Sequence, residues 1–171
     1  GSIDHSDTTL TIRDASEAII YVCMATNYMN DNLNEQLANT FRKSSNEKYE
    51  VLRKNHVAEY RKLYDRVEVS FGQTDNAALP IDQRLHAFNR GEPDPGLMAL
   101  YFQFGRYLLI SSTRPGSLPP NLQGLWANEV QSPWNGDYHL NINVQMNHWP
   151  ANITNLSELH LPLIEWTKSQ V

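Results

Sequence analysis

The sequence predicts a mainly helical chain with a few β-strands near its N-terminus. From about Ser45 onward, apolar side chains recur every three to four residues, which is the period of an α-helix. Before that point, residues 8–12 alternate between polar and apolar side chains, and residues 18–25 form an apolar run rich in β-branched and aromatic members. With 171 residues, the chain is long enough to bury the core of one domain.

The two N-terminal segments, residues 8–12 and 18–25, are separated by a short Asp14-Ala15-Ser16 break and predict a pair of antiparallel strands. Two strands alone bury too little apolar surface to be stable, so they indicate part of a larger sheet. Residues 30–34 (NDNLN) predict a turn or linker. Alternation resumes at residues 67–71, which predict a further short strand.

Helices account for most of the rest. The first predicted helix places an apolar face opposite charged residues. That face comprises Tyr49, Leu52, His56, Tyr60 and Leu63. His56 on it is more typical of a packed, hydrogen-bonded histidine than of a ligand. Residues 81–88 predict a short helix that Gly91 can end.

Residues 95–112 predict a long helix that Asp94 caps and Pro95 opens. Because it is apolar almost all round, we expect an inner helix covered on several sides, in which Arg106 needs a partner. A helix is predicted at residues 140–149, with Pro150 ending or kinking it.

The last predicted helix runs through Leu159 and Leu163 to Trp166. Asn155 and Glu158 have close to a capping-box spacing at its start. The sequence shows no C-cap signal before Val171, which, with the orphan strands, predicts that the chain is a fragment.

Charge and cysteine usage exclude several classes of protein. The chain carries 14 basic and 19 acidic residues, a net charge of −5, with no basic cluster, which argues against nucleic acid or an anionic membrane surface as a partner. Its one cysteine, Cys23, cannot form an intrachain disulfide or a multi-cysteine metal site. No metal-binding spacing of histidine and carboxylate and no phosphate-binding loop occurs, so neither a metal nor a cofactor is predicted.

The stretch from Ser111 to Trp149 has an unusual composition. It contains three of the four tryptophans and many amides. The amides are Asn121, Gln123, Asn128, Asn135, Asn141, Asn143, Gln145 and Asn147. Flat apolar faces mixed with neutral donors and acceptors suit a sugar, which has C–H faces and many hydroxyls. Two other readings stay open, in which the Asn and Gly residues only make turns and the Trp residues only fill a core.

Three segments also carry a resemblance to a known family. RYLLISSTRPGSLPPNLQGLW, SPWNGDYHLNINVQMNHWP and NLSELHLPL follow one another and resemble the inverting α-L-fucosidases of glycoside hydrolase family 95. A small departure is His148, where a Tyr is more usual. The resemblance implies the end of a β-sandwich-like domain at residues 1–29, a linker with helices and a short strand at 30–93, and the opening helices of an (α/α)6 toroid at 94–171.

The same resemblance implies roles for particular residues. The two Asn of the NIN motif map to Asn141 and Asn143, which would position the attacking water, while the family's catalytic Glu and Asp would lie beyond Val171. The pair should not lie within a full helical turn, where residues two apart diverge by about 200°. His139 would contact a substrate hydroxyl, although a structural histidine is an equally good interpretation. The further predicted substrate-binding residues are Tyr138, Trp126, Trp134, Asn121 and Gln123.

Together these features predict part of a glycoside hydrolase that releases terminal α-L-fucosyl groups from oligosaccharides with inversion. By resemblance, the parent protein would be secreted or periplasmic. The chain alone would be inactive and would self-associate. A non-catalytic sugar-binding helical module and a ligand-free helical scaffold remain as alternatives.

Overall fold

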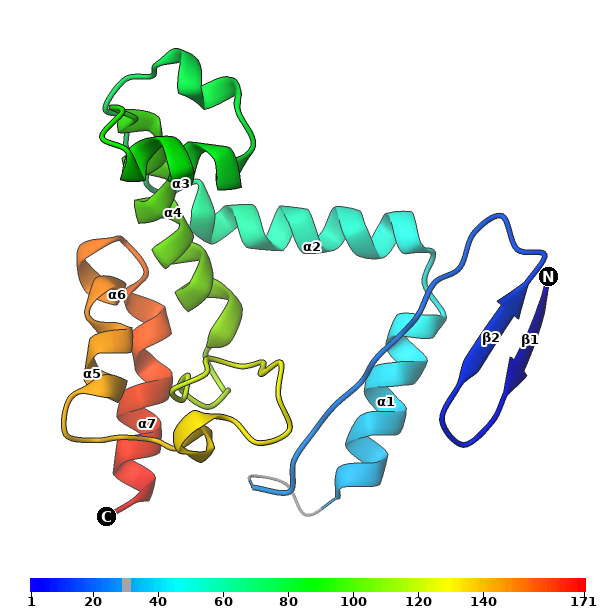
Figure 1. Cartoon of the computed structure of the whole chain (residues 1–171). Coiled ribbons are helices and arrows are strands. Elements are labelled where there is room, and N and C mark those ends of the chain that lie inside the picture. Colours follow the sequence, from blue (N-terminus) through cyan, green and yellow to red (C-terminus); the bar gives the residue numbers. More distant parts are fainter. Residues whose placement is uncertain (29–31) are drawn as a thin grey trace. The chain divides into compact units, whose positions relative to one another are not determined.

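The structure, a computed structural model, describes residues 1–28 and 32–171 and is mainly helical with a small N-terminal sheet (Figure 1). This confirms the predicted balance of helix and strand. The chain divides into two compact units, Gly1–Ala58 and Glu59–Val171, which are described separately. Within the described residues, no helix has both the length and the apolar character needed to cross a lipid bilayer.

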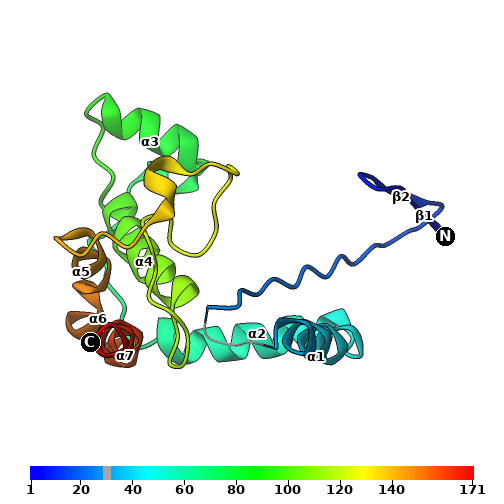
Figure 2. The same ribbon diagram turned by 90° about the horizontal axis from the view of Figure 1, so that it is seen from below.

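The sheet is an antiparallel hairpin of β1 (Ser2–His5) and β2 (Leu10–Arg13), in which Ile3 pairs with Ile12. The predicted strand at residues 8–12 is therefore largely correct, but the strand at 18–25 is wrong. Those residues are extended without a strand partner in the described chain (Figure 2). The partner of β2 is instead the preceding segment, because a tight turn closed by the Ser6 N–H to Thr9 carbonyl bond brings it close at little entropic cost.

Helix α1 (Leu33–Ser45) was not predicted. Of the predicted turn at 30–34, Asn30 and Asp31 lie outside the described residues, and Leu33 already begins the helix. Glu35 in the first turn and Lys43 in the last turn both suit the helix dipole. None of the described residues in Gly1–Ala58 is buried, so this unit lacks a packed core of its own.

Helix α2 (Tyr49–Tyr64) confirms the periodicity predicted from about residue 45. The strand predicted at residues 67–71 is wrong, since this segment has no strand pairing. Its backbone is used differently: the Val67 carbonyl accepts hydrogen bonds from the side chains of Gln103 (2.7 Å) and Arg106 (3.3 Å). A 3₁₀ turn, η1 (Asp75–Ala78), follows this segment.

Helices α3 (Ile81–Asn89) and α4 (Pro95–Ser112) begin and end as the sequence predicts. Gly91, with φ of +91°, takes the left-handed position after α3. Asp94 caps α4 by accepting a bond from the Leu97 N–H (2.9 Å). Arg84 donates two hydrogen bonds to the same carboxylate, at 2.8 and 2.9 Å, and these bonds are the main reason that the pKa of Asp94 is lowered.

Helix α4 is not covered on several sides, which corrects the sequence prediction for this chain. It buries only Leu97, Arg106, Leu109 and Ile110. Most of its other apolar side chains are exposed. They are Met98, Leu100, Tyr101, Phe104, Tyr107 and Leu108.

The C-terminal part consists of short helices. They are η2 (Pro133–Gly136), α5 (Asn143–His148), α6 (Pro150–Ile153), η3 (Ser157–His160) and α7 (Leu161–Ser169). The predicted interruption at Pro150 is present between α5 and α6. Asn155 is not the predicted helix cap. It has φ of +59° and takes the left-handed position after α6, where the Leu156 N–H bonds to the Ala151 carbonyl (2.8 Å).

The core of Glu59–Val171 joins the end of α2 to α4, α6 and η3. Its buried members are Leu63, Leu109, Ile110, Ala151, Leu156 and Leu159, with Tyr60 and Tyr64 packed against them. Arg106 lies beside this core with 1% of its surface exposed. Its guanidinium donates to the carbonyls of Leu63 (2.9 Å) and Tyr64 (2.8 Å), so the partner that the sequence required is backbone rather than a carboxylate.

His148, at the end of α5, is also almost fully buried, with 1% of its surface exposed. Neither ring nitrogen has a partner at hydrogen-bonding geometry within the described chain, although the Leu159 backbone lies close enough to favour the protonated ring. Burial is the main cause that lowers the pKa of His148 to about 4, and the neighbouring His160 ring, 5.7 Å away, adds to it.

We predict that Arg106→Met destabilises the chain by about 2–4 kcal/mol, because it removes the guanidinium donor from the Tyr64 carbonyl and leaves the Leu63 carbonyl with only the long bond from the Arg66 N–H (3.4 Å). Urea unfolding followed by tryptophan fluorescence measures the change. Arg61→Met is the control, since Arg61 is exposed and only 3.9 Å from Asp65 in a weak surface pair. Equal effects of the two substitutions would contradict the assignment.

The buried His148 predicts a pH-dependent stability. Because its folded pKa of about 4 lies below the ordinary 6.5, the unfolded chain takes up a proton that the folded chain does not. Stability should therefore fall as pH decreases from about 6.5 to 4, by at most about 3 kcal/mol from this residue. His148→Tyr, which introduces the residue more usual in the resembled family, should remove this slope in unfolding measurements. The same change at exposed His86 is the control, and an unchanged slope in His148→Tyr would refute the prediction.

Candidate functional site

The long connection between α4 and α5 is irregular but internally bonded. The Thr113 hydroxyl donates to the Leu118 carbonyl (3.0 Å) where the segment leaves α4. Further along, Asn121 and Gly124 form an isolated bridge, and Gly124 has φ of +82°, which favours glycine. The Leu122 N–H reaches the Asp137 carbonyl (3.4 Å), which ties this turn to the approach to α5.

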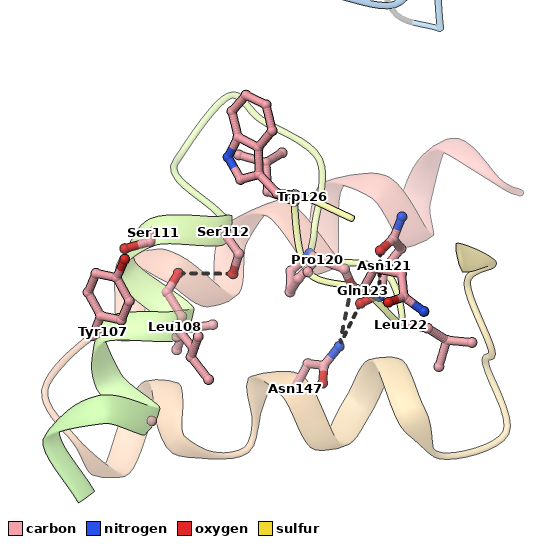
Figure 3. A pocket seen from close by; sticks show the side chains of 14 residues that line it. Tyr107, Leu108, Ser111, Ser112, Pro120, Asn121, Leu122, Gln123, Trp126 and Asn147 are labelled. Atoms are coloured by element: carbon pink, nitrogen blue, oxygen red, sulfur yellow. Dashed lines mark hydrogen bonds between the residues drawn. The ribbon is translucent and has the colours of Figure 1, made fainter. Parts of the chain in front are cut away.

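A pocket of about 480 Å³ lies between the C-terminal half of α4, the loop at residues 120–126 and Asn147 of α5 (Figure 3). Its lining residues are Gly105, Tyr107, Leu108, Leu109, Ser111, Ser112, Pro120, Asn121, Leu122, Gln123, Gly124, Leu125, Trp126 and Asn147. None of them is an acid, a lysine, an arginine or a histidine. Aromatic and aliphatic walls with amide and hydroxyl groups suit a neutral polar ligand better than an ion.

Three of the predicted substrate-binding residues line this pocket: Asn121, Gln123 and Trp126. The Asn121 side-chain oxygen accepts a bond from the Gln123 N–H (2.8 Å), which shapes the turn. The Gln123 amide nitrogen donates weakly to the Pro133 carbonyl (3.4 Å). Trp126 is 63% exposed, which is unusual for an indole and leaves its ring accessible.

Asn141 and Asn143 stand at the entry to α5 and do not line the pocket. Asn141 lies in the preceding turn and is exposed, whereas Asn143 is the first residue of the helix and is half-buried. Ile142 between them has φ of −160° and ψ of −38°, so the pair does not sit within a regular helical turn. This backbone agrees with the expectation from the sequence that the two residues do not lie within a full helical turn.

The remaining predicted residues, His139, Tyr138 and Trp134, also lie outside the pocket lining. The Tyr138 hydroxyl donates to the Pro119 carbonyl (2.8 Å), and its ring packs on Trp166 with centroids 4.7 Å apart. Trp134 is 73% exposed and has φ of +50°. The His139 carbonyl accepts a bond from the Val144 N–H (3.1 Å), while its imidazole is half-buried.

Sequence reasoning did not single out several residues of the pocket. Tyr107 and Ser111 lie one turn apart on α4, and helical spacing alone could have placed them on one face. Asn147 lies four residues after Asn143 on α5, which places the two on one helix face. That these residues face the loop at 120–126 depends on the tertiary fold, and no local sequence pattern indicates it.

The carboxylates near the site are not paired for acid–base catalysis. Burial alone would raise the pKa of Glu158, but a backbone hydrogen bond and Arg66, 2.7 Å away, lower it overall. Glu158 therefore stays ionised and is unsuited to donate a proton. Asp137, Glu129 and Glu165 are exposed. Among the described residues, no group of three or more His, Cys, Asp or Glu side chains could hold a metal ion.

Comparison with known proteins gives the chain its family. Residues 48–171 match the family described as "Glycosyl hydrolase family 95 catalytic domain". The chain is 36% identical to "Probable alpha-fucosidase A" of Aspergillus niger over 177 residues, covering 95% of this chain and 22% of that protein. It is 42% identical to "Alpha-L-fucosidase 2" of Arabidopsis thaliana over 123 residues, covering 69% of this chain and 14% of that protein.

A third relative, "Probable alpha-fucosidase A" of Aspergillus oryzae, is 39% identical over 118 residues, covering 67% of this chain and 16% of that protein. The chain thus spans about a fifth or less of the length of these curated relatives. The family match covers well over half of the chain and includes the pocket, the NIN motif and the core around Arg106. The chain belongs to glycosyl hydrolase family 95 and resembles a stretch of the α-L-fucosidases.

Proposed function

We propose that this chain contributes the water-positioning residues and part of the sugar-binding surface of an inverting α-L-fucosidase. The substrate would be a terminal α-L-fucosyl group on an oligosaccharide or glycan. The names of the relatives support this substrate, and the neutral pocket supports a sugar as ligand. No cofactor is needed, because glycoside hydrolysis proceeds by proton transfer and water attack alone.

One observation carries the proposal. Within the described residues, the side chains of Asn141 and Asn143 have no hydrogen-bond partner, whereas neighbouring amides are engaged. Gln145 donates to the Leu140 carbonyl (2.5 Å), and Asn147 donates to the Asn121 carbonyl (3.3 Å). Amides that only shaped the fold would be expected to bond within it. Asn141 and Asn143 of the NIN motif are left free, and the exposed Asn128 is the other free amide of this stretch.

Free amide oxygens at this position suit the orientation of a water molecule. Each can accept one of the water's protons, which leaves a lone pair directed at the anomeric carbon. An amide is too weak a base to remove the proton, so its contribution is position rather than basicity. Inversion further requires an acid and a base roughly 6.5–9.5 Å apart. We assign neither role to a described carboxylate, and we place both beyond Val171.

The pocket would bind sugar through its flat faces and its unused polar atoms. The Trp126 and Tyr107 rings are both accessible and can stack on C–H faces. The Asn121 amide nitrogen and the Gln123 amide oxygen are not bonded within the described chain and can meet hydroxyls. Leu108 and Leu125 add apolar surface that suits the methyl group of a 6-deoxy sugar. His139, Tyr138 and Trp134 stay as proposed substrate contacts beyond the pocket.

We also propose how the chain fits into its parent. Residues 94–171 would form the opening helices of an (α/α)6 toroid, residues 30–93 a linker, and residues 1–29 the end of a β-sandwich-like domain. The exposed apolar face of α4 is consistent with this assignment, because inner helices of a toroid are covered by neighbouring helices. In isolation, the same face would promote self-association of the chain.

The proposed reaction is tested by the stereochemistry of the product. The complete protein that carries this sequence should release L-fucose from an α-fucoside, and proton NMR should detect the β-anomer first, before mutarotation. The 171-residue chain assayed alongside should give no turnover, because it would lack the general acid, a loss of about 10²–10⁴-fold from that group alone. First appearance of the α-anomer would refute inversion, and turnover by the chain would refute the placement of the acid.

The role of the Asn pair predicts a particular kinetic signature. In the complete protein, Asn141→Ala and Asn143→Ala should each lower kcat by about 10–100-fold with little change in KM, because the lost contact is to water rather than to sugar. Asn128→Ala, an exposed amide in the same region, is the control. A variant that raised KM alone would identify its residue as a substrate contact instead.

A further inference from the structure

The loop that forms one wall of the pocket contains two consecutive prolines, Pro119 and Pro120, both buried. Prolines have no N–H, so their segment cannot be held by a ladder of backbone bonds. Two side chains hold it instead. The Tyr138 hydroxyl donates to the Pro119 carbonyl (2.8 Å), and the Asn147 amide donates to the carbonyls of Pro120 (3.5 Å) and Asn121 (3.3 Å).

These two side chains come from either side of the NIN motif. Tyr138 precedes Asn141 by three residues, and Asn147 follows Asn143 by four, one turn further along the same face of α5. Figure 3 shows Asn147 pointing from its helix toward Pro120 and Asn121. The pocket wall is thus bonded to residues on both sides of the NIN motif.

We propose that Asn147 is a positioning residue that holds the sugar-binding loop at residues 119–124 in register with the water-binding pair Asn141 and Asn143. This inference rests on the proposed function, since it assumes that sugar sits on the loop and water on the pair. Each Asn147 bond is long, so neither is strong alone. The shared amide nevertheless restrains two successive carbonyls at once, and with Tyr138 it restrains three.

The Asn147 contacts would therefore set the distance between the bound sugar and the attacking water. A loop released from Asn147 keeps its own bonds, including the Asn121 oxygen to Gln123 N–H contact (2.8 Å), and so keeps its shape and its affinity. What it loses is the bonded contact with α5 itself, so that only the Leu122 N–H to Asp137 carbonyl bond and the Tyr138 hydroxyl to Pro119 carbonyl bond still restrain its placement. A displacement of about 1 Å between bound sugar and attacking water is enough to cost about 100-fold in rate. The effect of losing Asn147 therefore falls on kcat.

The test uses the complete protein with the isosteric variant Asn147→Asp, whose carboxylate cannot donate to either carbonyl. At pH 7 we expect kcat to fall by about 10–100-fold and KM to stay within about twofold. As pH falls toward 4, the carboxyl regains a proton and can donate again, so the ratio of variant to wild-type kcat should rise. Asn152→Asp, an exposed amide on α6 without a described partner, should show neither effect. A ratio that does not change with pH would overturn the proposal.

A second measurement separates this inference from the proposed function. Hydrogen exchange at pH 7 should be faster in residues 121–124 of Asn147→Asp than in wild type, and unchanged in α3, whatever substrate the protein takes. Adding Tyr138→Phe should cost less in the variant than in wild type, because both groups restrain the same loop. Faster exchange in a protein without fucosidase activity would sink the proposed function but keep the link between loop and helix. Unchanged exchange with an active wild type would sink the role of Asn147 alone.

Discussion

The arrangement of the C-terminal unit depends on the binding of the Arg106 guanidinium to the backbone at the end of α2. A buried cation needs several acceptors, and the carbonyls of Leu63, Tyr64 and Val67 supply them together with the Gln103 side chain. The same contacts bond α4 to the end of α2 and engage the Val67 carbonyl. Because the C-terminal half of α4 forms one wall of the pocket, this interaction also determines where the pocket lies.

The amides of the region after α4 divide into two groups by what they bond. One group forms hydrogen bonds with backbone groups and so builds the turns and the contact between loop and helix. Its members are Asn121, Gln145 and Asn147. The side chains of Asn141 and Asn143 have no hydrogen-bond partner within the described residues, although Asn143 is half-buried. Composition could not separate the two groups, since both belong to one run of similar residues. Only the hydrogen bonds distinguish an amide that shapes the site from one available to a ligand.

Local signals in the sequence predicted local features well. Asp94 before Pro95, Gly91 after an amphipathic segment and Pro150 within a helical pattern each act through their own backbone, and all three boundaries are where they were expected. The prediction of strand pairing was wrong, because pairing depends on residues distant in the sequence. Residues 18–25 have the composition of a strand but no partner among the described residues. For the same reason, the sequence predicts a sugar-binding role for Trp126 but does not place Tyr107 and Asn147 in the same pocket. Leu33, Leu37 and Phe41 repeat at the helical spacing of four in α1, but the composition of NDNLN is typical of a turn and hides the start of that helix.

The chemistry of the site follows from the absence of charge in it. A carboxylate beside the attacking water would accept protons more strongly than an amide, but it would also titrate and would repel a second carboxylate needed nearby. In the proposed function, amides at Asn141 and Asn143 would orient the water at any pH and would leave the acid–base steps to other groups. The uncharged pocket is compatible with this division, because a neutral sugar gains nothing from a fixed charge that must be desolvated on binding. A site of this kind would select its ligand by shape and hydrogen bonding. Its selectivity would therefore depend on the contacts that position the loop, the helix and the core relative to one another.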